Sequence, residues 1–223
     1  MTPTMRRNTI IILLLSALAL YQYYQVTNQS GNDSTQAIEG LPWQIELLPQ
    51  GKSRVFGVVL GQSTMADAFA VLGKDYELAI ISMLDEQGAL EAYYPRYLAG
   101  VLTGKLILAA QIDKTQLQAI RKRATRIDYT GSGAKKFRLH QDDIATAKSL
   151  PVATITFIPT TNFDEEIIMM RFGKPDRRIQ TNDNTEHYLY RERGLDIIHN
   201  KKGKEVLQYV APSQFNRLSD ALN

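Results

Sequence analysis

The three histidines are the first residues to consider for metal binding or acid–base chemistry. None of His140, His187 and His199 lies within five residues of another, whereas zinc ligands on one element usually recur at intervals of about three to five residues. The chain contains no cysteine, which excludes thiolate metal sites, disulfides and a cysteine nucleophile. Glu186 directly precedes His187, but neighbouring side chains of a strand point to opposite faces. We therefore expect no metal, no cofactor and no catalytic residue.

Two acidic runs and one glycine-containing loop also have the composition of reactive sites. Asp142, Asp143 and residues 164–166 fall at the starts of predicted helices, where carboxylates interact favourably with free N–H groups and with the helix dipole. Residues 100–105 (GVLTGK) are one residue shorter than a phosphate-binding loop, and Leu106 replaces the hydroxyl that would bind magnesium. Structural roles account for these segments, and we expect a protein that is not an enzyme.

Five tyrosines on predicted strands are candidates for contact with another protein. Residues at alternate strand positions share one face, and an exposed row of tyrosines would form the rigid amphipathic surface that is enriched at protein interfaces. If the same face packs on a helix, these side chains belong to the core, and the sequence leaves both alternatives open. The candidates are Tyr93, Tyr94, Tyr97, Tyr188 and Tyr190.

A basic stretch in the middle of the chain is the candidate for contact with an anionic partner. Residues 121–138 contain a single acid, Asp128, and would suit anionic lipid headgroups or an acidic protein surface. A solvated face with a flexible Gly-Ser-Gly loop is the alternative. Without Arg6 and Arg7 the chain keeps 24 basic residues against 23 acidic ones, so we expect no nucleic acid partner. The basic residues of the stretch are Arg121, Lys122, Arg123, Arg126, Lys135, Lys136 and Arg138.

The amino terminus predicts a membrane address. Two arginines precede an uncharged apolar run, and residues 9–26 would form about 27 Å of helix, slightly less than a bilayer core. This pattern favours a single transmembrane anchor in the inner membrane, with residues 1–8 in the cytoplasm and the body in the periplasm. The alternative is a signal peptide, cleaved after the Ala-Leu-Ala triplet at 17–19, which would release the body into the periplasm. Residues 27–40 are polar and would form a flexible tether.

Two helix ends of similar sequence indicate an internal repeat. A first helix would begin after a capping residue, Ser63 or Thr64, of which Thr64 would form a capping box with Asp67. It would end at Gly73, where glycine adopts the left-handed conformation without steric cost. A second helix would begin after the capping residue Asn162 and end at Gly173. Each end is followed by an aromatic-rich strand and by a Gly-Lys turn that leads into another strand. The chain therefore predicts an α+β fold of two pseudo-repeated modules, each a short helix plus an antiparallel strand meander.

The repeat divides the chain beyond the tether into three parts. The first α+β module would span residues 41–112, and the second would span residues 159–223. Residues 113–158 would connect the modules and carry the basic loop. This connecting segment would itself contain helices at 113–123 and 142–149.

The helix end, the aromatic-rich strand and the Gly-Lys turn together resemble a known family. The segments LGQSTMADAFAVLGKD (60–75) and RFGKPD, with EHYLYRERGLDIIHNKKGKEVLQYV further on, are similar to small outer-membrane assembly lipoproteins of the SmpA/OmlA type. They are also similar to the tandem modules of the beta-lactamase inhibitor proteins. The resemblance covers about half of the chain and implies an adaptor or inhibitor that works through its sheet face. The family anchors through a lipidated cysteine, which this chain lacks, so the inner membrane is favoured over the outer one.

These features predict a non-catalytic envelope protein with an assembly, scaffold or adaptor role. Its partner would be another envelope protein, bound on a concave sheet that the two modules form side by side. The alternative is a proteinaceous inhibitor of a periplasmic hydrolase. An enzyme of unrecognised type would need a cleft that holds at least two of His187, Glu186, Asp196 and His199.

Overall fold

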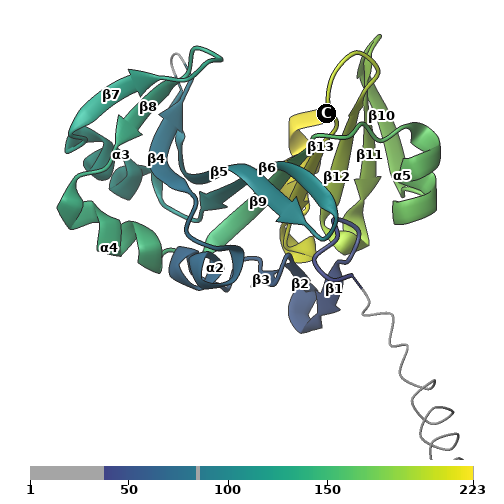
Figure 1. The fold of residues 1–223 in the computed structure, drawn as a ribbon, viewed down its shortest axis with the longest axis horizontal. Helices are drawn as coiled ribbons and strands as arrows, with labels where there is room; N and C mark the ends of the chain where they lie inside the picture. The colour runs from purple at the N-terminus through teal and green to yellow at the C-terminus, as the bar shows by residue number, and fades with distance from the viewer. Residues whose placement is uncertain (1–37, 84–85, 223) are drawn as a thin grey trace, which may run out of the picture. The chain divides into compact units, whose positions relative to one another are not determined.

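The computed structural model describes residues 38–83 and 86–222. They form an α+β fold built on one large antiparallel sheet, so the predicted fold class is confirmed (Figure 1). The predicted cytoplasmic residues 1–8, the anchor at 9–26 and most of the tether at 27–40 lie outside the described residues. Within the described part, no helix combines the length and the apolar composition needed to cross a bilayer.

The described residues form two sheets and several short helices. In the large sheet, whose described pairings are all antiparallel, the spatial order is β10 (Arg177–Asn182), β11 (Thr185–Tyr190), β12 (Leu195–Asn200), β13 (Val206–Val210), β9 (Val152–Pro159), β6 (Leu102–Ala110), β5 (Ala89–Ala99), β4 (Glu77–Ser82), β8 (Lys135–Arg138) and β7 (Arg126–Tyr129). The small sheet contains β1 (Glu46–Leu48), β2 (Lys52–Val55) and β3 (Val58–Val59). The α-helices are α2 (Met65–Leu72), α3 (Lys114–Lys122), α4 (Gln141–Ser149), α5 (Glu165–Phe172) and α6 (Asn216–Ser219). Single 3-10 turns occur at η1 (Pro49–Gly51), η2 (Arg191–Arg193), η3 (Pro212–Gln214) and η4 (Asp220–Leu222).

The first predicted helix begins and ends as its sequence indicates. The Thr64 hydroxyl accepts a hydrogen bond from the Asp67 N–H at 3.1 Å, and the Asp67 carboxylate accepts one from the Thr64 N–H at 2.9 Å. This reciprocal capping box satisfies two N–H groups that have no partner inside the helix. Gly73 ends α2 with a φ of +97°, a conformation that residues with a side chain rarely adopt.

The second predicted helix also ends at the expected glycine, Gly173, with a φ of +75°. Its predicted start was wrong, because Asp164 and not Asn162 caps α5. The Asp164 carboxylate accepts a hydrogen bond from the Ile167 N–H at 2.8 Å. Asn162 instead accepts one from the ammonium of Lys204, at 2.6 Å. Both residue types cap helices well, and the side chain of Asn162 is bonded instead to Lys204 of the β12–β13 turn.

The main core lies on one face of the large sheet. Tyr94, Leu106, Phe157 and Leu207 are successive cross-strand neighbours on this face, and all four are buried. The small sheet, α2 and α5 pack on this row, while α3 and α4 cover the same face near β4, β5 and β8. In Figure 1, β5, β6 and β9 lie between the β7–β8 hairpin and strands β10–β13, with α2 and β3 beneath them. Because strand side chains alternate, the opposite face is left for other contacts.

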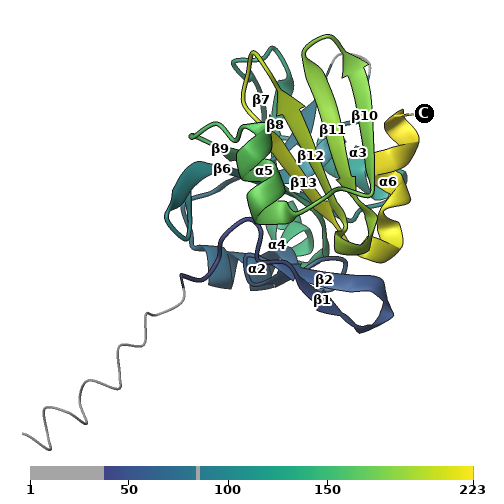
Figure 2. The same ribbon diagram turned by 90° about the vertical axis from the view of Figure 1, so that its right-hand side faces the viewer.

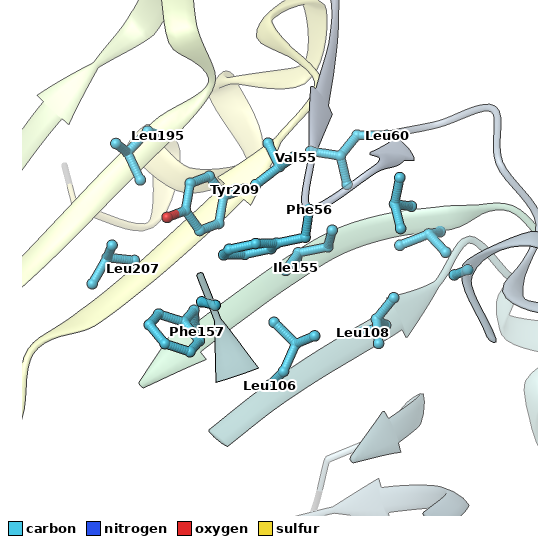
Figure 3. Close-up of a cluster of buried hydrophobic side chains, with 14 of the residues drawn as sticks. Val55, Phe56, Leu60, Leu106, Leu108, Ile155, Phe157, Leu195, Leu207 and Tyr209 are labelled. Carbon is cyan, nitrogen blue, oxygen red and sulfur yellow. The ribbon is translucent and has the colours of Figure 1, made fainter. Parts of the chain in front are cut away.

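The turn between β2 and β3 contributes an aromatic ring to the middle of this core. Phe56 and Gly57 have φ values of +51° and +80°, as expected of a type I′ hairpin turn. A residue with a side chain in this conformation costs about 1 kcal/mol or more. Burial of the ring offsets this cost, since its centroid lies 5.6 to 5.8 Å from those of Tyr97, Phe157 and Tyr209. Figure 3 shows the ring of Phe56 between strands from both halves of the sheet.

The opposite face of the sheet is covered on one half only. Phe215, at the start of α6, packs with Leu189 of β11 and Val210 of β13. Figure 2 shows α5 and α6 on opposite sides of strands β10–β13. Among the described residues, no helix packs on the corresponding face of β4, β5 and β6. This uncovered area is the candidate site.

Candidate partner-binding site

The uncovered half of the sheet forms a groove of about 640 Å³. Sites of about 300–1,000 Å³ are typical for ligands of drug size, so the groove is large enough for a few side chains of a partner. Its floor comes from β4, β5 and β6, and the β7–β8 hairpin forms one wall. The lining residues are Glu77, Ala79, Ile81, Glu91, Tyr93, Lys105, Ile107, Tyr129, Thr130, Gly131, Ser132 and Lys136.

Strand periodicity places the floor residues together. Tyr93 of β5 is the cross-strand neighbour of Glu77 on β4 and of Ile107 on β6. Residues two positions away on each strand share the same face, which adds Ala79 and Glu91 to the floor. The floor is therefore mostly apolar, with carboxylates at two positions.

The hairpin wall is held by its own hydrogen bonds. The Thr130 N–H donates to the Ala134 carbonyl at 2.8 Å, and the hydroxyls of Thr130 and Ser132 lie 2.9 Å apart. Tyr129 lies at the end of β7 and is 69% exposed. The composition of residues 121–138 indicates a basic stretch and gives no strand signal around Tyr129, so the sequence does not identify this tyrosine as a site residue.

Some charged residues of the groove have a partner of opposite charge, and others do not. The ammonium of Lys136 donates to the Glu77 carboxylate at 2.9 Å, whereas Lys105 is exposed. Glu91 is half-buried, and no described residue donates a hydrogen bond to its carboxylate or forms an ion pair with it. Burial alone raises the pKa of Glu91 to about 7, because water solvates the charged form poorly there.

Three of the five candidate tyrosines belong to the core. Tyr94, Tyr188 and Tyr190 are at most 3% exposed, so the structure excludes them from direct contact with a partner. The reason is that their face of the sheet packs on α2 and α5. The hydroxyl of Tyr94 donates to the Gly73 carbonyl at 3.1 Å, and that of Tyr190 donates to the Gly173 carbonyl at 2.9 Å.

The other two candidate tyrosines remain partly accessible. Tyr97 packs its ring on Phe56 and lies at the edge of the core. Tyr93 points to the opposite face and lines the groove. Of the five candidates, Tyr93 is therefore the one that the structure brings into the site.

Most of the predicted basic stretch is paired within the chain. Arg123 binds the buried Asp143 with two hydrogen bonds, Arg126 binds Asp128 at 2.6 Å, and Lys136 binds Glu77. Arg138 lies 4.0 Å from Asp128, and Arg121 donates to the Gln87 carbonyl at 3.1 Å. Lys122 and Lys135 are the two members for which no partner was found among the described residues. The seven residues lie on or next to α3, β7 and β8, where Arg126 and Arg138 are exposed cross-strand neighbours, and their contact with an anionic partner stays a prediction.

The polar residues of the second half are separated by the sheet. Glu186 and His199 are cross-strand neighbours on the face of α5, where Arg178 forms two hydrogen bonds of 2.8 Å to Glu186 and lowers its pKa. His187 and Asp196 lie on the face of α6, buried and bonded at 2.8 Å. None of these four residues lines the groove.

The described residues contain no group of three His, Cys, Asp or Glu side chains placed to hold a metal ion. Comparison with protein families, with curated proteins and with solved structures finds no match for this chain. The resemblance to SmpA/OmlA-type lipoproteins and to beta-lactamase inhibitor proteins therefore stays a prediction.

Proposed function

We propose that this chain is a non-catalytic protein of the bacterial envelope that binds a partner protein through the groove on β4, β5 and β6. Its amino-terminal segment would anchor it in the inner membrane, with the folded part in the periplasm, in an assembly, scaffold or adaptor role. The observation that carries the proposal is a sheet face whose second half is covered by α6 and whose first half is open and largely apolar. Concave apolar surfaces with a few polar groups are typical binding sites.

We further propose that the folded part contains two copies of one module. In each half, a tyrosine hydroxyl binds the carbonyl of the glycine that ends the helix of that half. Tyr94 and Tyr190 occupy equivalent places in the strand register. Tyr94 pairs with Leu106, whose other neighbour is Phe157, and Tyr190 pairs with Leu195, whose other neighbour is Tyr209. Both glycines have positive φ and donate their N–H to the carbonyl four residues earlier.

The strand register supports the same interpretation. At the centre of the sheet, Leu207 pairs with Phe157 and Tyr209 pairs with Ile155. A two-fold axis through the intervening pair, Thr156 and Gln208, would exchange these two pairs and relate β9 to β13. It would also relate β6 to β12 and β5 to β11, so that the groove corresponds to the face that α6 covers in the second half. The open face is thus the place where a partner would complete the first module.

Site-specific crosslinking in the native cells tests the proposed function. A photoreactive amino acid at Ile107, on the groove floor, should give a discrete adduct with one envelope protein. The matched control is the same amino acid at Ala145, an exposed position of α4 on the opposite side of the sheet. Equal adducts at both positions, or none from the groove, would contradict the proposal. If the captured protein is a hydrolase that the chain inhibits, the inhibitor alternative holds instead of a scaffold.

A further inference from the structure

Glu91 is the carboxylate in the groove without a compensating charge. It lies half-buried on the floor, among Ala79, Tyr93 and Ile107. Burial raises the pKa of Glu91, and no neighbouring charge contributes to this shift. An ionised carboxylate in such surroundings has lost part of its hydration without gaining a donor. Any ligand that brings a cation to Glu91 restores this lost interaction.

Neither of the basic residues that line the groove pairs with the Glu91 carboxylate. Lys136 is bonded to Glu77 at 2.9 Å. Lys105 lies on β6 four residues from Ala109, the cross-strand neighbour of Glu91, and this separation is roughly 13 Å along the strand. The other charged and titratable groups of the groove are Tyr93 and Tyr129, and no histidine is present among the lining residues. Glu91 is therefore available to a cation from outside the chain.

Aromatic side chains near the carboxylate favour the same class of ligand. Tyr93 lies two residues from Glu91 on the same strand face, and Tyr129 lines the groove from the hairpin wall. Lysine and arginine cations interact favourably with the faces of aromatic rings, and this attraction is larger where water is partly excluded. A carboxylate beside tyrosines on an apolar floor thus suits a basic side chain flanked by apolar ones.

We infer that the groove recognises a segment of the partner protein by a lysine or arginine side chain whose cation pairs with the Glu91 carboxylate, while flanking apolar side chains lie on Ile81, Tyr93 and Ile107. This inference rests on the proposed function and adds the chemical class of the bound segment. A protein segment is favoured over a free small cation because the floor offers apolar area on three adjacent strands. A charge-assisted hydrogen bond of this kind is roughly twice as strong as a neutral one.

Binding of four synthetic peptides to the full-length protein tests the inference. The peptides are fluorescein-labelled heptamers of the sequence Thr-Val-Thr-X-Thr-Val-Thr, so that X shares one face of the extended peptide with the valines. X is lysine, arginine, norleucine or glutamate, and fluorescence anisotropy measures the affinity of each peptide. We expect the lysine and arginine peptides to bind at least about tenfold more tightly than the norleucine peptide at pH 8. Glu91→Gln should remove this preference, while Glu166→Gln, the same change at an exposed position of α5, should preserve it.

The pH dependence gives a second readout for the same peptides. Because a protonated Glu91 cannot pair with a cation, the affinity of the lysine peptide should fall about tenfold between pH 8 and pH 6. The affinity of the norleucine peptide should stay constant or rise. Equal affinities for the lysine and norleucine peptides, an unchanged preference in Glu91→Gln, or no binding of any peptide at 1 mM would overturn the inference. Crosslinking at Ile107 that persists in Glu91→Gln cells would keep the proposed function while rejecting this ligand class.

Discussion

Replacement of Glu91 by glutamine should make the protein more stable at high pH and leave it unchanged at low pH. In the folded protein, burial raises the pKa of Glu91 from the usual 4.5 to about 7. Each pKa unit of difference between the folded and unfolded states corresponds to about 1.4 kcal/mol. The charged carboxylate therefore lowers the free energy of unfolding by up to about 3 kcal/mol at pH 8.

The sign of this effect follows from proton binding. Between pH 4.5 and about 7 the folded state holds the Glu91 proton more tightly than the unfolded state does, so stability falls as the pH rises. Glutamine has nearly the same shape and carries no charge, which removes this loss. The variant and the natural protein should therefore have equal stability at pH 4 and diverge progressively up to pH 8.

Urea unfolding from pH 4 to pH 8 measures the difference between the two proteins. Trp43 is the only tryptophan, and its ring packs edge-on against Phe172 at 6.1 Å, so its fluorescence reports on the folded core. Glu166→Gln controls for the change in net charge. It removes a carboxylate from the first turn of α5, so at pH 8 it should lose up to about 1 kcal/mol of stability and gain none. A pH-independent difference for Glu91→Gln, or a less stable variant at pH 8, would refute the argument that the carboxylate is buried without a partner.

Three further predictions concern the fold. Phe56→Ala should lower the free energy of unfolding by about 3–5 kcal/mol, because the ring fills the centre of the core, and a loss below about 1 kcal/mol in urea unfolding would contradict this packing. Gly73→Ala should cost about 1–2 kcal/mol from its positive φ, whereas Gly131→Ala, in open space, should be nearly neutral in the same assay. Tyr94→Phe and Tyr190→Phe should each lose about 1 kcal/mol by thermal or urea unfolding, and strongly unequal losses would count against equivalent roles in two modules.

Local signals in the sequence predicted the helices well. The reciprocal bonds of Thr64 and Asp67 and the left-handed glycines at both helix ends depend on residues within a few positions of one another. Such interactions are determined by the local chain, so sequence spacing is sufficient to find them. The predicted cap Asn162 was wrong, and its side chain instead binds Lys204, a contact with a residue about forty positions away that local spacing does not reveal.

The candidate site was predicted less completely. Tyr93 was a candidate contact residue, whereas Glu91 and Tyr129 were not. The strand pattern places Glu91 and Tyr93 on one face, but no pattern within β5 tells whether a helix will cover that face. That information depends on where α6 and the β7–β8 hairpin pack, and both are distant in sequence.

The sequence by itself determined the α+β class, the ends of α2 and the glycine that ends α5, because these depend on residue types at short spacing. Only the tertiary structure decided that Tyr94, Tyr188 and Tyr190 are buried while Glu91 faces an open groove. Neighbouring positions of one strand share the same backbone conformation, but their side chains lie on opposite faces of the sheet. They differ in function because packing from remote elements excludes water from one face of the sheet and leaves part of the other accessible.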